Sequence, residues 1–315
     1  MKIVTAEEVR RRLTVEKGIE LMRQGLLALA TGSAYQPIRT VTKLPNGEAF
    51  GFMPAYMGDE DYFGAKVITA FHKNAGTAYP SHMGYVMLFE SKHGSFVGMA
   101  DASAITEIRT GAVSGVATDL LARPSANTLA IIGAGAQARS HLAAMCAVRP
   151  IKTVRIFDIY ASQAIKFKEE MSQKYEVDIL VASSVKEAVK EADIICTLTP
   201  SKAAFLEASW ISPGAHINAV GTFTPTTREI TSDLMAASKL YADNIDAMKA
   251  ESGEFIIPKS EGLIDDHHVK GTIGDLLLKR VEGRQSKDEI TLFNALGLAI
   301  EDVICARYLC IENEM

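Results

Sequence analysis

The stretch AIIGAGAQARSHL at residues 130–142 decides the fold of this chain. An apolar run leads directly into Gly133 and Gly135, and a helical pattern begins around Ala138. In a strand–turn–helix of this kind, Gly133 permits the tight turn and Gly135 lets the backbone approach a pyrophosphate. Ala138 is small enough for the helix to sit close to the strand, and the helix start attracts phosphate groups. The predicted dinucleotide contacts in this turn are Gly133, Gly135, Ala136, Gln137 and Ala138.

An acidic residue follows at the position that a dinucleotide site requires. The next predicted strand, TVRIFD, ends at Asp158, which stands 25 residues after Gly133 and can accept hydrogen bonds from the adenosine ribose. A carboxylate there repels a 2′-phosphate, and the segment DIYASQA offers no arginine or lysine to receive one. We therefore predict NAD rather than NADP as the cofactor. The alternative is a glycine turn in an α/β protein that binds no cofactor.

The chain after Pro124 alternates apolar runs with helical stretches. Runs buried on both faces are typical of parallel strands joined by crossover helices. We therefore predict an α/β fold, a doubly wound parallel sheet of the Rossmann type, over residues 123–294. The predicted strands are TLAIIG, TVRIFD, DILVAS, ADIICTLT, AHINAVG and SKLYADN.

The first part of the chain has a different pattern. Residues 1–35 are predicted to be helical, with a capping box from Thr5 to Glu8 and a stop at Gly32. Residues 36–102 contain short strand-like runs joined by PNG and KHG turns, which predicts a mostly antiparallel sheet. A long helix is expected from residue 102 to the Arg123-Pro124 pair.

The last stretch, TLFNALGLAIEDVICARYL, is predicted to be helical and apolar on more than one face. We expect it to pack on the first domain or on a partner subunit. The predicted substrate-binding and dimerisation domain, of α+β type, therefore comprises residues 1–122 with 295–315.

Composition excludes several classes of function. The net charge is −5, so the chain has no global attraction to nucleic acid or to anionic membranes. The charged N-terminus lacks an apolar signal core and no run of 18 apolar residues occurs, which predicts a cytoplasmic protein. The four cysteines form no CxxC pair, and DDHHV at 265–269 is better explained as a solvated loop, so no metal site is predicted. Neither GxSxG nor HExxH occurs.

Three cations in the first domain stand among apolar or small neighbours, namely Arg39, Lys66 and Arg109. Each one alone is often a surface residue. Together they predict a small anionic substrate, most simply a carboxylate held by a guanidinium fork. Lys66 is the candidate proton donor to a substrate nitrogen, since burial near two arginines lowers the pKa of a lysine.

The chain resembles the ornithine cyclodeaminase/μ-crystallin family over nearly its whole length. The resemblance rests on the blocks QPIRT, FMPAYM, KVIT, YPSHMG, ITEIRTGAVSGVA, IIGAGAQARSH, ISPGAHINAVG and LFNALGLAIEDV, which occur in this order. It implies a doubly wound NAD domain and a substrate domain built from both chain ends, whose sheet makes a homodimer. It also implies a NAD(H)-dependent oxidoreductase that acts on the C–N bond of a small amino or imino acid.

The resemblance also implies roles for individual residues. Positions matching Arg39, Lys66 and Arg109 bind the substrate carboxylate and neighbouring groups. The segment NAVG lies along the nicotinamide, and His82 is expected to be a buried structural histidine. The further cofactor contacts that the resemblance implies are Thr110, Thr199, Asn218, Val220 and Gly221.

Phe223 departs from the pattern of the cyclodeaminases in this family, which carry an aspartate two residues after the glycine matching Gly221. Phenylalanine cannot deprotonate or pair with the distal amine of ornithine, whereas an apolar ring suits a cyclic imine. We therefore predict reduction of a cyclic imine carboxylate such as 1-pyrroline-2-carboxylate to proline, with Phe223 in the substrate site. Thr222, Thr224 or Glu229 could instead replace the missing aspartate. The open alternatives are an ornithine cyclodeaminase, an alanine or opine-like amino-acid dehydrogenase, and a crystallin-like binding protein without activity.

Overall fold

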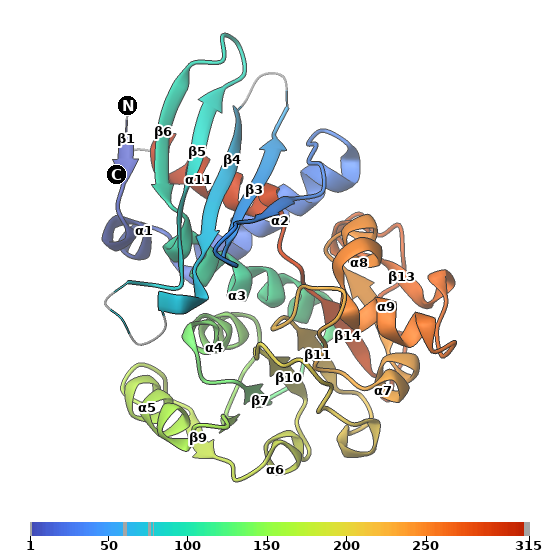
Figure 1. The fold of residues 1–315 in the computed structure, drawn as a ribbon. Helices are drawn as coiled ribbons and strands as arrows, with labels where there is room; N and C mark the ends of the chain where they lie inside the picture. Colours follow the sequence, from blue (N-terminus) through green and yellow to red (C-terminus); the bar gives the residue numbers. More distant parts are fainter. Residues whose placement is uncertain (1, 59–61, 75–76, 78, 312–315) are drawn as a thin grey trace. The chain divides into compact units, whose positions relative to one another are not determined.

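The chain forms two compact units (Figure 1). The computed structural model describes residues 2–58, 62–74, 77 and 79–311. Unit 1 comprises Met1–Thr110 with Gly297–Met315, and unit 2 comprises Gly111–Leu296. The division falls inside helix α3 (Ala102–Leu121), whereas the sequence placed a boundary after residue 122. The predicted range 295–315 also extends over residues 312–315, which lie outside the described residues.

Unit 1 is built on a sheet with the strand order β1-β6-β5-β4-β3-β2. Strands β2 to β6 pair antiparallel, as predicted, and β1 adds a parallel edge beside β6. The strands of unit 1 are β1 (Lys2–Val4), β2 (Thr40–Lys43), β3 (Ala49–Tyr56), β4 (Tyr62–Ala70), β5 (His82–Glu90) and β6 (Phe96–Asp101). Its helices are α1 (Ala6–Arg12), α2 (Val15–Thr31), the 3₁₀ turn η1 (His72–Asn74), the first part of α3, and α11 (Ala299–Ile311).

The N-terminal helix prediction is confirmed in part. The capping box between Thr5 and Glu8 starts α1, and Gly32 ends α2 with a left-handed φ of 78°. Two details were wrong. Strand β1 precedes the first helix, and the chain breaks between α1 and α2 because the Thr14 side chain accepts the N–H of Lys17 and begins a new helix.

Helix α11 covers one face of the unit 1 sheet (Figure 1). The covered face includes Val86 and Leu88, which are fully buried. The other face exposes large apolar side chains. The strand register places these side chains in line across neighbouring strands. This exposed face carries Phe50, Phe52, Met83 and Tyr85.

Unit 2 is a doubly wound parallel sheet, which confirms the predicted fold class. Its strand order is β13-β12-β14-β11-β10-β7-β8-β9, and every pair is parallel. Its strands are β7 (Thr128–Ile132), β8 (Thr153–Phe157), β9 (Asp178–Val181), β10 (Ile194–Thr197), β11 (His216–Ala219), β12 (Lys239–Ala242), β13 (Val269–Thr272) and β14 (Thr291–Asn294). Its helices, with the 3₁₀ turns η2 and η3, are α4 (Ala136–Val148), α5 (Ala161–Met171), α6 (Val185–Val189), η2 (Ala208–Trp210), α7 (Ser232–Ala237), α8 (Ile245–Glu251), α9 (Gly253–Ser260), η3 (Asp266–His268) and α10 (Ile273–Leu277).

Strand β14 corrects the prediction for the C-terminal stretch. The residues TLFN were expected to be helical, but they form a strand between β11 and β12, and the helix begins only at Ala299. All four residues of β14 are buried. A strand buried on both faces shows no alternation, so a short apolar run of this kind cannot be distinguished from a buried helix by its pattern.

The strand order reverses between β7 and β10. Strands β8 and β9 extend the sheet on one side of β7, and β10, β11 and β14 extend it on the other. In open parallel sheets, ligands bind at the carboxyl ends of the strands beside such a reversal. A ligand site is therefore expected at the loops that follow β7, β8, β10 and β11.

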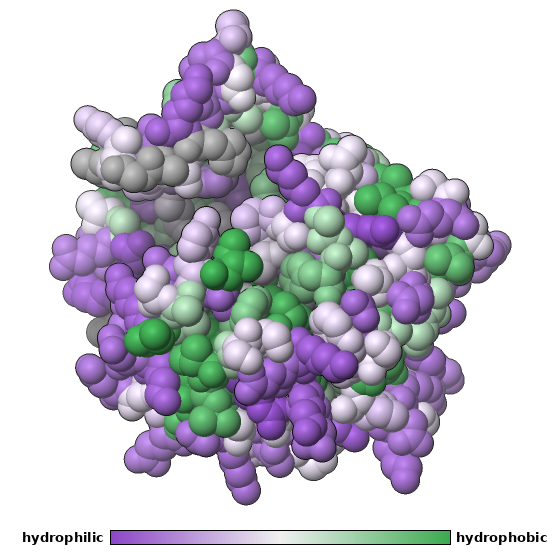
Figure 2. Space-filling model, turned by 60° about the horizontal axis from the view of Figure 1, so that its bottom comes forward, coloured by the Kyte–Doolittle hydropathy of each residue, from purple (hydrophilic) through white to green (hydrophobic). Residues whose placement is uncertain are grey.

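The exposed surface is mixed in character. The view of Figure 2 shows apolar patches (green) between hydrophilic side chains (purple). Such a mixture is ordinary for globular proteins, whose surface is more than half apolar in area. Among the described residues, no helix is both long and apolar enough to cross a membrane.

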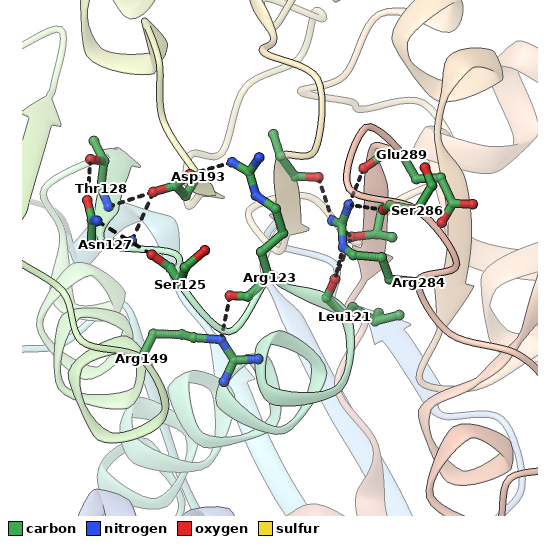
Figure 3. Close-up of polar contacts among 12 residues, drawn as sticks. Leu121, Arg123, Ser125, Asn127, Thr128, Arg149, Asp193, Arg284, Ser286 and Glu289 are labelled. Carbon is green, nitrogen blue, oxygen red and sulfur yellow. Dashed lines mark hydrogen bonds and ion pairs between the residues drawn. The ribbon is translucent and has the colours of Figure 1, made fainter.

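Two arginines cap the C-terminal end of α3 within unit 2 (Figure 3). The last carbonyl groups of a helix have no partner inside the helix. The Arg149 Nη2 group donates to the carbonyl oxygens of Thr118, Asp119 and Ala122 at 2.8–3.0 Å. Its Nη1 group pairs with the Asp119 carboxylate at 2.8 Å.

The second arginine connects the same helix end to the sheet (Figure 3). Arg284 donates to the carbonyl oxygen of Leu121 at 2.7 Å and to that of Ala215 at 3.1 Å. It also donates to the hydroxyl of Thr291 at 3.0 Å, at the start of β14. The amino-terminal edge of the sheet and the end of α3 are therefore fixed to each other by charge-assisted hydrogen bonds.

We expect Arg149→Met to lower the free energy of unfolding by about 2–4 kcal/mol, because it leaves several buried carbonyl groups without donors. Chemical denaturation followed by circular dichroism measures this change. Lys166→Met is the control, because the Lys166 side chain is 64% exposed and its Nζ lies 3.9 Å from Glu170. Equal stability losses in the two variants would contradict the capping role.

Candidate functional site

The turn between β7 and α4 is tightly packed at its first glycine. Gly133 is buried and has a φ of 101°, a conformation that favours glycine. A Cβ atom there would lie 2.9 Å from the carbonyl oxygen of Leu198 and 3.1 Å from the Thr199 methyl group. The tight turn predicted at Gly133 is confirmed, and it brings the loop after β10 against the glycine turn.

The second glycine borders open space. Gly135 is exposed, has a φ of −71°, and would meet nothing within 4 Å of an added Cβ. It is the N-cap of α4, whose first residues Ala136 and Gln137 are exposed and half-buried, while Ala138 is fully buried. Free backbone N–H groups at a helix start of this kind can bind a phosphate group.

Asp158 stands directly after β8 and is half-buried. Its Oδ2 accepts the N–H of Ala134 at 2.7 Å, and its Oδ1 accepts the N–H of Tyr160 at 2.8 Å. The carboxylate is thereby oriented beside the glycine turn. Each oxygen of an ionised carboxylate can accept a further hydrogen bond, so Asp158 can also bind ribose hydroxyl groups.

The loops after β10 and β11 meet at a buried carboxylate. Glu229 is fully buried, and its Oε1 accepts the N–H of Thr199 at 2.8 Å and the Thr199 hydroxyl at 2.7 Å. Its Oε2 accepts the N–H of Gly221 at 2.9 Å. Burial raises the pKa of Glu229, and these hydrogen bonds oppose the rise. Val220 precedes Gly221 and is half-buried.

A second buried carboxylate lies next to the first. Glu254 accepts the backbone N–H groups of Glu229 and Ile230 at 2.5 and 3.1 Å, and the Thr222 hydroxyl at 3.2 Å. Burial raises the pKa of Glu254 to about 8, and the charge of Glu229 contributes to the rise. Sequence analysis did not identify Glu254.

Two predicted cofactor residues have side chains engaged elsewhere. Asn218 is fully buried, and its amide donates to the Thr118 hydroxyl at 3.0 Å. The Thr110 hydroxyl donates to the carbonyl oxygen of Thr106 at 2.6 Å, within α3 in unit 1. Phe223 has the opposite character, because 54% of its surface is exposed.

Two of the three predicted cations, Lys66 and Arg109, pair with acids of α11 in unit 1. Lys66 on β4 is only 3% exposed, and its Nζ lies 2.7 Å from Asp302 Oδ2. Arg109 pairs through Nη1 with Glu301 Oε2 at 2.8 Å and through Nε with Asp302 Oδ1 at 3.3 Å. Asp302 therefore bridges the lysine and the arginine inside the unit.

The pKa of Lys66 is lowered from its ordinary value of 10.5 to about 8. Burial is the main cause, since it disfavours the charged ammonium group. The positive charges of Arg109 and of the half-buried Arg39 lower the pKa further, while Asp302 opposes the change. The pKa of Lys66 is thus lowered, as expected from the sequence, and the charge of Asp302 limits the size of the shift.

Glu301 and Asp302 are the acids that sequence analysis missed in this cluster. They stand in the quoted block LFNALGLAIEDV but received no role. The available signal was the pair of adjacent acids within an apolar helix, because buried acids are nearly always paired with cations. The pair of acids could therefore have been predicted to pair with the cations Lys66 and Arg109.

The prediction for His82 was wrong. His82 is the first residue of β5 and is exposed, since only later residues of the strand, such as Val86, face α11. Two other histidines, His141 and His216, are fully buried. His141 lies 3.0 Å from the Ser114 hydroxyl and 2.8 Å from the carbonyl oxygen of Gln137. Burial lowers the pKa of His141 to about 4, so it is neutral at physiological pH.

Comparisons with known proteins agree with this geometry. Ketimine reductase mu-crystallin of Mus musculus is 36% identical over 277 residues, covering 88% of this chain and 84% of the mouse protein. Delta(1)-pyrroline-2-carboxylate reductase of Bacillus cereus is 33% identical over 311 residues, covering 98% and 95% of the two chains.

A solved structure is also closely similar. Thermococcus litoralis Delta(1)-pyrroline-2-carboxylate reductase, in complex with NADH and L-proline, superposes with a TM-score of 0.94 at 35% identity. The match covers 98% of this chain and 96% of that one. The sequence pattern of the ornithine cyclodeaminase/mu-crystallin family matches residues 1–313, and the chain therefore belongs to that family.

Proposed function

We propose that this protein is a NADH-dependent reductase of a small cyclic imine carboxylate, and that it reduces 1-pyrroline-2-carboxylate to proline. Relatives that carry out this reaction or related ones match nearly the whole chain, and one was solved with NADH and L-proline. The observation that distinguishes a reductase from a cyclodeaminase is the state of Glu229, which is buried and accepts hydrogen bonds from Thr199 and Gly221.

Unit 2 carries residues that fit the cofactor. Gly135 leaves open space at the start of α4, and Asp158 is oriented at the end of β8. Further cofactor roles are proposed for Gly133, Ala136, Gln137, Ala138, Thr199, Asn218, Val220 and Gly221, and for Thr110 of unit 1. NADH supplies the hydride of the reaction, and the Asp158 carboxylate disfavours a 2′-phosphate at the ribose.

Unit 1 carries residues that fit an imino-acid substrate. The guanidinium groups of Arg39 and Arg109 hold the carboxylate of the substrate. Lys66 Nζ donates a proton to the imine nitrogen while the adjacent carbon accepts the hydride. Asp302, 2.7 Å from Nζ, orients the ammonium group and keeps it protonated near neutral pH.

The residues around Phe223 do not supply the base that cyclodeamination needs. The Thr222 hydroxyl donates to Glu254, and the hydroxyl groups of Thr224 and Thr227 lie 2.7 Å apart. Glu229 is fully buried. The exposed ring of Phe223 offers an apolar contact to a cyclic imine and cannot accept a proton.

We also propose that the protein forms a homodimer through the exposed face of the unit 1 sheet. Phe50, Phe52, Met83 and Tyr85 make this face apolar, and exposed apolar patches mark interfaces. An archaeal alanine dehydrogenase, solved as a dimer with bound NAD, is 29% identical with a TM-score of 0.92, covering 98% of this chain and 94% of that one. The cytoplasmic location stays a prediction.

The proposed function predicts substrate preference. With NADH, we expect 1-pyrroline-2-carboxylate to be reduced to proline at a rate well above that of pyruvate with ammonia. With NAD and L-ornithine, we expect negligible release of ammonia and proline. Absorbance at the NADH band and product identification measure both reactions. Efficient ammonia release from ornithine would overturn the proposal, and preferential turnover of pyruvate would indicate an alanine dehydrogenase.

The lowered pKa of Lys66 predicts how the rate of reduction depends on pH. A proton donor must carry its proton, so activity is full below the pKa of Lys66 and falls as pH rises through about 8. Above that value kcat/KM should fall about tenfold per pH unit. Asp302→Asn removes the charge that opposes deprotonation, and we expect the fall to begin at lower pH. A pH profile of kcat/KM for both proteins tests this, and identical profiles would remove Lys66 from the role of donor.

The two glycines predict separable effects. Gly133→Ala places a Cβ near the Leu198 carbonyl oxygen at a left-handed φ, and should destabilise the protein by about 1–3 kcal/mol. Gly135→Ala should leave stability nearly unchanged but weaken NADH binding, because its Cβ enters the space where a pyrophosphate approaches. Thermal unfolding and fluorescence titration measure the two effects. Equal stability losses, or unchanged NADH affinity in Gly135→Ala, would contradict this assignment.

A further inference from the structure

We propose that Glu229 is a positioning residue for the nicotinamide half of the cofactor. Its carboxylate holds the loop after β10 to the loop after β11, and so fixes the spacing of Thr199 and Gly221. This inference rests on the proposed function, since it assumes that a nicotinamide cofactor binds at the carboxyl edge of the unit 2 sheet. It assigns a role to a residue that the chemistry above does not use.

The carboxylate of Glu229 is the acceptor in each of its side-chain hydrogen bonds. Two backbone N–H groups and the Thr199 hydroxyl reach its two oxygens at 2.7–2.9 Å. A carboxylate is the side chain best suited to accept from three donors at once, because both of its oxygens are acceptors. The two loops are thereby joined through one side chain.

The backbones of the two loops also approach each other closely. A Cβ on Gly221 would lie 2.2 Å from the Thr199 carbonyl oxygen, 2.3 Å from the Thr199 nitrogen and 2.7 Å from Glu229 Oε1. Only glycine fits at this distance. On its other side, the Thr199 methyl group packs against Gly133, as described above. Thr199 is therefore held between the glycine turn and the Glu229 carboxylate.

Glu254 holds Glu229 in place from behind. It accepts the N–H groups of Glu229 and Ile230 from the first turn of α9. A Cβ on Gly253, the first residue of that helix, would lie 2.2 Å from the Thr227 carbonyl oxygen, so the helix start also packs against this segment. The segment that carries Glu229 is thus fixed by contacts within unit 2.

A buried carboxylate at this position is unfavourable if only the stability of the fold is considered. Burying an acid disfavours its charged form, and an apolar side chain could fill the same volume without that cost. Three donors converge on Glu229 at the strand ends where ligands bind in this fold. We infer that the acid is retained because it fixes the loops in the geometry that the nicotinamide half requires.

The test separates the two halves of the cofactor. ADP-ribose contains the adenosine, both phosphates and the second ribose but lacks the nicotinamide. NADH and ADP-ribose are titrated into the intact protein by fluorescence and calorimetry, respectively. Glu229→Gln keeps the volume but replaces one acceptor oxygen with an NH2 group, which cannot accept from Thr199 or Gly221. We therefore expect NADH affinity to fall roughly tenfold or more. ADP-ribose affinity should stay within about twofold of wild type.

Matched variants control the measurement. Thr199→Val removes the hydroxyl donor and should weaken NADH by a smaller factor. Thr199→Ser retains the hydroxyl but loses the methyl group beside Gly133, and should weaken NADH less than Thr199→Val does. Glu261→Gln makes the same chemical change in unit 2 at a residue that pairs with Arg228 at 3.3 Å, and should affect neither ligand. If Glu229→Gln does not fold, the Thr199 pair carries the test.

The outcomes distinguish this inference from the proposed function. Equal loss of NADH and ADP-ribose, or no loss of either, would overturn the positioning role and leave the reductase proposal intact. Selective loss of NADH in a protein that does not reduce 1-pyrroline-2-carboxylate would support the role of Glu229 and refute the proposed substrate. A wild-type protein that fails to bind NADH would refute both.

Discussion

The ion pair between Lys66 and Asp302 is the interaction on which the chemistry of unit 1 depends. Lys66 and Arg109 are both buried, and two cations cannot be buried beside each other without anionic partners. Asp302 contacts both cations and Glu301 contacts Arg109. Burial and the neighbouring arginines lower the pKa of Lys66 to about 8 against the opposing charge of Asp302, which brings the titration of the ammonium group close to neutral pH.

Unit 2 applies the same principle with the opposite sign. Glu229 and Glu254 are buried acids that accept hydrogen bonds from backbone N–H groups and threonine hydroxyls. Such donors stabilise a carboxylate without adding a mobile side chain, so they fix backbone segments in place. In unit 1 buried charges shift the pKa of Lys66, whereas in unit 2 a buried carboxylate joins two loops.

Sequence patterns predicted much of this structure, and the features that they missed have identifiable physical reasons. Gly133 and Asp158 could be predicted because backbone geometry and ribose binding restrict residue type at a fixed spacing. The Lys66 cluster was predicted only in part, since Asp302 is 236 residues away in the sequence and no local pattern links them. Strand β14 was missed because a strand buried on both faces lacks periodicity. Glu229 was weighed as a base, and only its three donors revealed that it is fully engaged.

The discontinuous course of unit 1 has a consequence for synthesis on the ribosome. Lys66 and Arg109 emerge early, but the acids that neutralise them lie on α11, near the end of the chain. Unit 2, by contrast, is one continuous segment, Gly111–Leu296, and can collapse as soon as it is translated. Lys66 and Arg109 therefore stay hydrated until the last helix leaves the exit tunnel. A chain that ends between residues 296 and 300 therefore contains all of unit 2 but lacks the acids that pair with Lys66 and Arg109.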